Sequence, residues 1–483
     1  MRRIVLFAAL FLILFQVKAE LKLPKVFADH MVLQRGQEIP VWGEADPRQW
    51  VNVTFQGKKY RVKADKEGKW MLKMDAFPKG GPYILSINTK KESKVLENVM
   101  MGDVWLLGGQ SNMEWALKRT NNGEDSIKTA NHPNIRLFEV GRNLSLEEIE
   151  EVPEAKWSIC SPETVANFSA IGYYFARRIE TDMDVAVGLL DINWGGTLSE
   201  AWTSADALLT HPDFKERVAK NQMEGPKDFS DPDLKKPNSW PTSLFYGMLE
   251  PVIPFAIKGA LWYQGESNAS RAYQYREIFP LMIEDWRAQW GQGDFPFLWV
   301  QLANFRQPKA EPVDSDWAEL REAQTMTLSL PNTAQAVIID KGEADDIHPR
   351  DKWTVAERLA KGAKKIAYGM DVVYSGPTFK SMEIQDDQIR ISFDHIGSGL
   401  VVNDKYGYVK GFAVAGADKK FHWVSGKQDG DQIVLETGDI KNPVAVRYGW
   451  ADNPDDVNLY NKEGLPANPF RTDDWKGITY GKR

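Results

Sequence analysis

Hydrophobic and polar residues alternate with a period of two near both ends of the chain. In the first segment, Val51, Val53 and Phe55 alternate with Asn52 and Thr54. In the last segment, the alternating apolar positions are Ile389, Ile391, Phe393, Val444, Val446 and Tyr448. Because neighbouring side chains of a strand point to opposite faces of a sheet, this spacing predicts strands with one buried face. We therefore expect an all-β domain, a sandwich, over residues 20–100 and a second all-β domain over residues 371–483.

The segment between these domains, residues 101–370, follows a different pattern. Short apolar runs occur at residues 104–107, 185–190, 257–263, 297–302 and 336–339. Helical spacing of apolar residues is clearest between them at residues 168–178 and after them at residues 353–366. Apolar strands that alternate with amphipathic helices are typical of a parallel sheet with helices on both faces. The sequence thus predicts a three-layer α/β domain.

A surface insertion is expected near residues 205–245 of this domain. The stretch at residues 224–240 is rich in Pro, Asp and Lys and carries no periodic apolar pattern. Such composition is typical of an exposed loop.

The first nineteen residues predict a signal peptide. Arg2 and Arg3 precede an apolar run over residues 4–15, and small residues lead to a cleavage site after Ala19. A membrane-spanning helix needs about 20 apolar residues, which this run does not reach. No later stretch approaches that length. We therefore expect a secreted or periplasmic protein that is not inserted into a membrane after cleavage.

Composition and charge narrow the possible functions. The 43% content of hydrophobic residues is typical of a globular protein, and a length of 483 residues is enough for more than one domain. The chain's net charge of -7 becomes more negative when Arg2, Arg3 and Lys18 are removed with the signal peptide. An acidic protein is a poor candidate for nucleic-acid binding. Cys160 is the only cysteine, so no intrachain disulfide can form, and a small buried residue is its simplest interpretation.

Ser111 is the candidate nucleophile. It follows the predicted strand at residues 104–107 and two glycines, Gly108 and Gly109, and it opens a short helix. The free amides and dipole of a helix N-terminus favour the negative charge that develops when a serine attacks a carbonyl. A serine at this place can equally be a simple helix cap. The loop is not the GxSxG elbow, because Met113 occupies the position of the second glycine.

His348 is the candidate base. It is the only one of six histidines that lies just beyond a predicted strand of the middle domain, and the only one with an acid three residues earlier. That acid, Asp345, is the predicted orienting group, since one loop can present both side chains together. Asp346, Glu343 and Asp340 are alternatives in the same loop.

Two further loops offer groups for an oxyanion hole. Gly196 follows the second predicted strand, and a glycine lets a backbone amide approach the reacting oxygen closely. Gln264 and Asn268 follow the third and carry side-chain amides. Each loop alone could be an ordinary turn, but serine, glycine, amide and Asp-x-x-His occur in order at the ends of successive strands.

These four blocks resemble those of the SGNH hydrolases. The similarity to the sialate O-acetylesterases is closer still in residues 109–113 (Gly-Gln-Ser-Asn-Met) and 262–266 (Trp-Tyr-Gln-Gly-Glu). It extends to residues 29–34 near the start and 470–473 near the end, and so covers nearly the whole chain. The third block departs from the Gly-x-Asn-Asp pattern of SGNH hydrolases, which leaves open whether Gln264 or Asn268 serves the oxyanion.

The resemblance implies an acyl-enzyme mechanism without metal or cofactor. In it Ser111 attacks the ester, His348 relays the proton and Asp345 orients His348. The amides of Ser111 and Gly196, with Gln264 or Asn268, would hold the oxyanion. Substrate contacts are expected at four further residues: Gln110, Asn112, Trp194 and Glu266.

The implied substrate is an O-acetylated carbohydrate, above all 9-O-acetylated sialic acid. An acetylated plant polysaccharide such as xylan is the alternative within enzymes. A non-catalytic carbohydrate-binding protein is the alternative from another class, and it is disfavoured because no member of the inferred triad is missing from the sequence.

Overall fold

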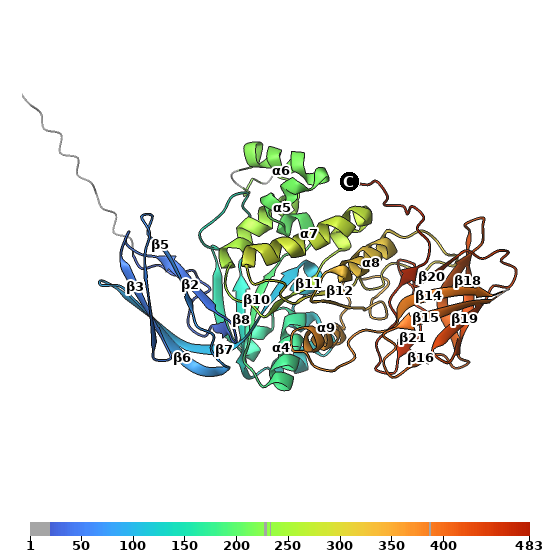
Figure 1. The fold of residues 1–483 in the computed structure, drawn as a ribbon, viewed down its shortest axis with the longest axis horizontal. Helices are drawn as coiled ribbons and strands as arrows, with labels where there is room; N and C mark the ends of the chain where they lie inside the picture. Colours follow the sequence, from blue (N-terminus) through green and yellow to red (C-terminus); the bar gives the residue numbers. More distant parts are fainter. Residues whose placement is uncertain (1–19, 227–228, 232, 386–387) are drawn as a thin grey trace, which may run out of the picture.

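The computed structural model describes residues 20–226, 229–231, 233–385 and 388–483. The predicted signal peptide lies outside the described residues. Three regions follow one another along the long axis of the molecule: an N-terminal β region, a central α/β region and a C-terminal β region (Figure 1). This order agrees with the one that the hydrophobic pattern predicts.

The N-terminal region consists of short strands whose faces differ in burial. Val51, Val53 and Phe55 are buried whereas Asn52 is exposed, which confirms the predicted alternation. The strands are β1 (Val32–Gln34), β2 (Ile39–Glu44), β3 (Trp50–Phe55), β4 (Lys58–Lys63), β5 (Lys69–Met74) and β6 (Gly80–Asn88). Strands β2 and β5 pair separately, while β3, β4 and β6 form one antiparallel ladder.

One long strand, β7 (Ser93–Gly109), joins the N-terminal and central regions. Its first part pairs antiparallel with β6, and its last part lies at the centre of the α/β sheet. The predicted domain boundary at residue 100 falls inside this strand. The hydrophobic core is consequently continuous from Val53 in the N-terminal region to Leu359 near the end of the central one.

The central sheet has the strand order β13-β12-β11-β7-β10-β8-β9. The strands beside β7 are β8 (His132–Val140), β9 (Ala155–Cys160), β10 (Val187–Asn193), β11 (Gly259–Tyr263), β12 (Phe297–Val300) and β13 (Thr333–Ala336). All neighbours pair parallel except β8 and β9. The predicted all-parallel sheet is therefore mixed, because β9 pairs antiparallel with β8 at one edge of the sheet. Strand β13 also precedes most of the run predicted at residues 336–339.

Helices cover both faces of this sheet (Figure 1). Helices α4 (Ala170–Met183) and α9 (Lys352–Ile366) lie on one face, and α7 (Ala272–Trp290) and α8 (Asp316–Met326) on the other. Packing is close on both sides: a β-carbon at Gly172 would lie 2.3 Å from Leu107, and one at Gly108 would lie 3.0 Å from Trp286. The remaining α-helices are α1 (Ser111–Glu114), α2 (Gly123–Lys128), α3 (Pro162–Val165), α5 (Ala205–Thr210) and α6 (Pro212–Glu224). Of these, α5 and α6 belong to the predicted insertion and project from the central region (Figure 1).

The C-terminal region is a seven-stranded antiparallel sheet in the order β14-β15-β19-β18-β17-β20-β22, with a separate pair β16-β21. The strands are β14 (Thr378–Gln385), β15 (Gln388–Asp394), β16 (Leu400–Val402), β17 (Tyr408–Ala415), β18 (Phe421–Asp429), β19 (Gln432–Glu436), β20 (Ala445–Tyr448), β21 (Leu459–Asn461) and β22 (Phe470–Arg471). The region has its own core, which includes Ile389 and Ile391. The chain then returns to the central region, where Glu319 of α8 accepts hydrogen bonds from the amides of Ile478 and Thr479.

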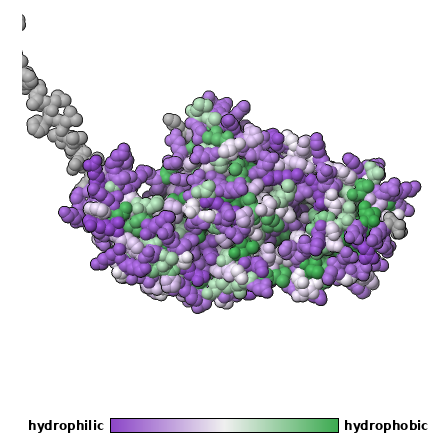
Figure 2. All heavy atoms as spheres, viewed as in Figure 1, coloured by the Kyte–Doolittle hydropathy of each residue, from purple (hydrophilic) through white to green (hydrophobic). Residues whose placement is uncertain are grey.

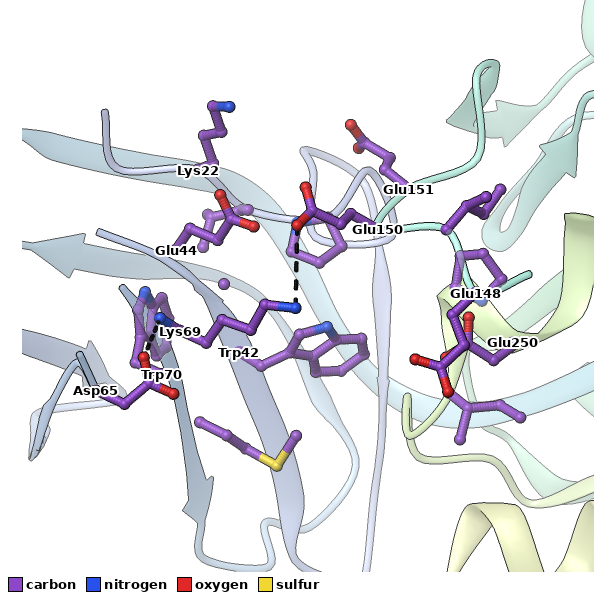
Figure 3. Close-up of a pocket in the computed structure, with 17 residues that line it drawn as sticks. Lys22, Trp42, Glu44, Asp65, Lys69, Trp70, Glu148, Glu150, Glu151 and Glu250 are labelled. Carbon is purple, nitrogen blue, oxygen red and sulfur yellow. Dashed lines mark hydrogen bonds and ion pairs between the residues drawn. The ribbon is translucent and has the colours of Figure 1, made fainter. Parts of the chain in front are cut away.

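The visible face of the molecule is mostly hydrophilic, with hydrophobic residues scattered over it (Figure 2). Within the described residues, no helix is long and apolar enough to cross a membrane. A cleft of about 640 Å³ lies where the N-terminal region meets the central one, with Trp42 on one side and Glu148 and Glu250 on the other (Figure 3). Lys69 and Glu150 approach to 3.9 Å across it. No residue of the four predicted site loops lines this cleft.

Candidate active site

Ser111 lies at the carboxyl end of the central strand β7. The chain leaves β7 at Gly109, which has a φ of +129°, and a β-carbon there would lie 2.2 Å from the carbonyl oxygen of Tyr263. Only glycine allows this turn. Ser111 is therefore the first residue of α1, and its amide cannot take part in the hydrogen bonding within that helix.

The structure brings His348 to Ser111 across the edge of the sheet. The Nε2 atom of His348 lies 2.9 Å from Oγ of Ser111, which is hydrogen-bond distance. The imidazole stacks on Trp115, with ring centroids 4.8 Å apart and planes inclined by 15°. Because Trp115 follows α1 directly, the helix that carries Ser111 also supports the ring of the predicted base.

The acid beside His348 is Asp346, and the prediction of Asp345 is wrong. Asp346 Oδ1 lies 3.2 Å from Nδ1 of His348 and also accepts the backbone N–H of His348 at 2.9 Å. Asp345 instead accepts a hydrogen bond from Gln307 Nε2 at 2.5 Å. The backbone hydrogen bond makes a local turn that places the carboxylate two residues before the histidine against its ring.

The other two acids in this loop have different partners. Asp340 forms a paired contact with Arg358 at 2.6 and 2.8 Å. Glu343 accepts the backbone N–H of Arg350 at 3.1 Å. Asp346 is therefore the one of the four candidates that contacts His348.

The electrostatic surroundings keep the imidazole neutral near neutral pH. Burial lowers the pKa of His348 below its ordinary value of 6.5, and the positive charges of Lys352 and Arg119 act in the same direction. The hydrogen bond and charge of Asp346 oppose this lowering. A neutral imidazole with Nε2 facing a hydroxyl can accept its proton.

At the site lie two backbone amides for which the described part of the chain supplies no hydrogen-bond acceptor. The loop after β10 turns at Gly195 and Gly196, and Gly196 is exposed with a φ of +76°. A β-carbon at position 195 would lie 3.2 Å from Cβ of Ser111, so this turn packs against the serine. Within the described residues, the N–H of Gly196 has no hydrogen-bond partner. Together with the amide of Ser111, it can donate to an oxyanion.

The Gly195 peptide is held from two sides. Its N–H donates to Glu114 Oε2 at 2.7 Å, and Glu114 is paired with Arg142. Its carbonyl oxygen accepts a hydrogen bond from Nδ2 of Asn238 at 3.2 Å. Asn238 belongs to the predicted surface insertion. The insertion therefore contacts the site loop directly.

The predicted oxyanion roles of the Gln264 and Asn268 side chains are wrong. Both side chains are buried, and both donors of Gln264 Nε2 are occupied, by Thr197 O at 3.1 Å and by Asn268 Oδ1 at 2.6 Å. Asn268 Nδ2 donates to Glu200 at 3.0 Å. These amides hold the loop that follows Gly196 in place, through Thr197 and Ser199.

Three of the four predicted substrate contacts are part of the protein's own hydrogen bonding. Asn112 is 1% exposed, Gln110 is 3% exposed, and Glu266 accepts a hydrogen bond from Asn112 at 2.6 Å. The prediction that Asn112 and Gln110 contact substrate is corrected by their burial, whereas Glu266 is half-buried and its contact with substrate stays a prediction. Trp194 is half-buried, and the guanidinium of Arg142 lies 5.2 Å from the centre of its ring.

Sequence reasoning missed Trp115, Glu114, Asn238 and Lys352. Two of these carried a signal in their spacing, because Trp115 is four residues after Ser111 and Lys352 is four residues after His348. Among the described residues, no three His, Cys, Asp or Glu side chains are grouped as a metal ion would require.

The sequence and fold are similar to those of known esterases. Residues 101–231 and 238–363 match the family described as carbohydrate esterase, sialic acid-specific acetylesterase. The sialate O-acetylesterase of Mus musculus is 29% identical over 506 residues, with 92% of each chain covered. That of Homo sapiens is 28% identical over 487 residues, covering 91% of this chain and 90% of the human one.

A solved structure gives a closer match. A carbohydrate acetylesterase from Xanthomonas citri superposes with a TM-score of 0.86 at 41% identity, covering 94% of this chain and 100% of that one. The family match spans more than half of this chain, and the Xanthomonas citri structure resembles the chain over nearly its full length. The chain is therefore an esterase that belongs to the carbohydrate esterase, sialic acid-specific acetylesterase family.

Proposed function

We propose that the chain is a serine esterase of the SGNH-hydrolase type. The 2.9 Å contact between Ser111 Oγ and His348 Nε2 carries this proposal. Its further support is that the serine, glycine and histidine blocks come after the carboxyl ends of three strands of the central sheet, β7, β10 and β13.

In the first half of the reaction, Ser111 Oγ attacks the carbonyl carbon of an acetyl ester while His348 Nε2 takes its proton. The tetrahedral oxyanion accepts hydrogen bonds from the amides of Ser111 and Gly196. Asp346 stabilises the imidazolium through Nδ1. As the ester bond breaks, His348 gives the proton to the departing sugar oxygen, and the acetyl group stays on Ser111.

In the second half, water replaces the sugar. His348 takes a proton from the water as it attacks the acetyl-serine carbonyl, and a second oxyanion forms in the same hole. Collapse of that intermediate releases acetate, and the proton returns to Ser111 Oγ. The sum of both halves is the hydrolysis of one ester bond, and no step needs a redox partner.

We further propose an O-acetylated carbohydrate, specifically 9-O-acetylated sialic acid, as the substrate. The family description and the names of the mouse and human relatives support the sialate. Sialic acid carries a carboxylate, and the guanidinium of Arg142 beside Trp194, although paired with Glu114, has further N–H donors that could bind it. Export through the predicted signal peptide would place the enzyme where extracellular glycans occur.

Acetate release from two substrates tests the proposal. Equal ester concentrations of O-acetylated sialoglycoprotein and acetylated xylan are incubated with the mature protein and with Ser111→Ala. We expect release from the sialoglycoprotein to be the faster, and to be lost in the variant. Faster release from xylan would contradict the sialate proposal, while acetate release by folded Ser111→Ala would contradict the serine mechanism.

A further inference from the structure

A lysine is buried directly behind the candidate active site. Lys352 is the first residue of α9, its side chain is 0% exposed, and its Nζ donates to Oδ1 of Asn112 at 2.6 Å. Its remaining close neighbours include the rings of Trp115 and Tyr263, at 5.7 and 5.5 Å. Burying an ammonium group is costly unless it is compensated, so fully buried lysines are rare.

Asn112, the partner of Lys352, connects the two reacting residues through their neighbours. It follows Ser111 in the chain, and its Nδ2 donates to the carbonyl oxygen of Ile347, which precedes His348, at 3.1 Å. The same Nδ2 donates to Glu266 Oε1 at 2.6 Å. One amide thus clamps the serine loop, the histidine loop and the loop after β11.

Lys352 determines which way this amide faces. An ammonium group only donates hydrogen bonds, so it can be matched only by the oxygen of Asn112 and not by the nitrogen. With Oδ1 facing Lys352, Nδ2 faces the two acceptors, Ile347 O and Glu266 Oε1. Without the ammonium, a flipped amide would place Oδ1 against these acceptors and open the clamp.

The charge of Lys352 also acts on its surroundings. Burial lowers the pKa of Lys352 to about 7, against the opposing effect of four acids: Glu266, Asp346, Glu343 and Asp351. The groups that act on the imidazole are Asp346, which favours its protonated form, and Lys352 and Arg119, which disfavour it. At the pH where His348 titrates, below 6.5, Lys352 carries its proton.

We propose that Lys352 is a positioning residue of the esterase reaction. Its ammonium group locks the Asn112 clamp between the Ser111 and His348 loops and places a positive charge near the imidazole. The proposal rests on the serine mechanism proposed above. In this role the buried ammonium group positions the reacting residues and takes no direct part in bond making.

Two substitutions separate the hydrogen bond from the charge. Lys352→Met keeps the length of the side chain and removes both, whereas Lys352→Gln keeps a donor and removes the charge. Lys365→Met is the matched control, because Lys365 lies near the other end of α9 and is paired with Asp371 at 3.5 Å. The measured quantities are kcat, KM and the pH dependence of kcat/KM with 4-nitrophenyl acetate.

We expect Lys352→Met to lower kcat by about 10²-fold with a much smaller change in KM, since misplacement of reacting groups costs about that much. Lys352→Gln should retain more turnover because it can still donate to Asn112. In both variants the acid limb of kcat/KM, which reports the base of the free enzyme, should move to higher pH by about half a unit to one unit. The control should match the wild type.

The outcomes distinguish this proposal from the mechanism on which it rests. Activity in folded Ser111→Ala would overturn the serine mechanism, whatever the lysine variants do. If Ser111→Ala is inactive and the acid limb of Lys352→Gln stays at the wild-type pH, the proposal for Lys352 is overturned. Lys352→Gln also decides the matter if circular dichroism shows that Lys352→Met does not fold.

Discussion

Asp346 contacts His348 twice, at the ring nitrogen Nδ1 and at the backbone N–H, both through its Oδ1 atom. The two residues are separated by one position, so the turn that holds the carboxylate also orients the imidazole. Burial opposes ionisation of Asp346, yet the hydrogen bonds and charge of His348 lower its pKa. The carboxylate is thus ionised wherever the esterase is expected to work.

Asp346→Asn should reduce turnover strongly, and Asp345→Asn should not. An amide at position 346 keeps the shape of the side chain but favours the wrong tautomer of His348. The expected loss in kcat is about 10² to 10⁴-fold, between the range of general base assistance and that of a serine-protease triad. Asp345→Asn is the matched control, because its carboxylate contacts only Gln307 among the hydrogen bonds of the described residues. A deeper loss at position 345 would show that the loop rearranges when substrate binds.

The pH dependence follows from the surroundings of His348. Burial lowers its pKa, so the neutral base persists below pH 6.5 and the acid limb of kcat/KM should lie below that value. Asp346 raises the pKa of His348, so removing its charge in Asp346→Asn should move the limb to still lower pH even as the maximum falls. Measurement of kcat/KM over pH 4 to 8 with buffers of constant ionic strength checks the position of the wild-type limb and the direction of its shift in the variant. An acid limb above 6.5 in the wild type would mean that another group titrates.

Asn238→Ala should lower kcat because it loosens a backbone peptide of the oxyanion hole. Asn238 fixes the carbonyl of Gly195, and the N–H of Gly196 belongs to the same planar peptide, so its direction is fixed too. Removing a whole oxyanion donor costs about 10² to 10³-fold, and we expect about 10-fold for loosening one. Asn221→Ala is the control from the same insertion, since its Nδ2 has no partner among the described residues. Equal activity of the two variants would mean that the Gly195 peptide needs no support from the insertion.

The hydrophobic pattern predicted most of the central sheet but missed its edge. Strands β10, β11, β12 and the last part of β7 are largely buried apolar runs, which the sequence displays directly. Strand β8 contains Arg136, which is 3% exposed and interrupts the apolar run. Its guanidinium is satisfied by the carbonyl oxygens of Pro133 and His30, and the second of these partners lies in the distant N-terminal region. A buried charge with tertiary partners cannot be told from a surface charge by sequence alone.

The sequence predicted which loops form the candidate site, but it did not predict the role of every side chain in them. Ser111, His348 and Gly196 follow from their positions at strand ends, and the structure places them together. The choice between Asp345 and Asp346 depended on one turn, and an aspartate two residues before a histidine is a signal that could have found it. The engagement of Gln264 and Asn268 depends on Thr197 and Glu200, whose proximity the sequence does not reveal.

The proposed mechanism requires Ser111 to be the nucleophile, and the residue that becomes covalently modified by a mimic of the reaction intermediate identifies the nucleophile. The mature protein is inactivated with an organophosphonate that mimics the tetrahedral intermediate, digested and mapped by mass spectrometry. We expect one adduct, on Ser111, with loss of esterase activity in proportion to its occupancy, and no adduct in Ser111→Ala. Inactivation with the adduct on a different residue, or with Ser111 unmodified, would contradict the proposed mechanism.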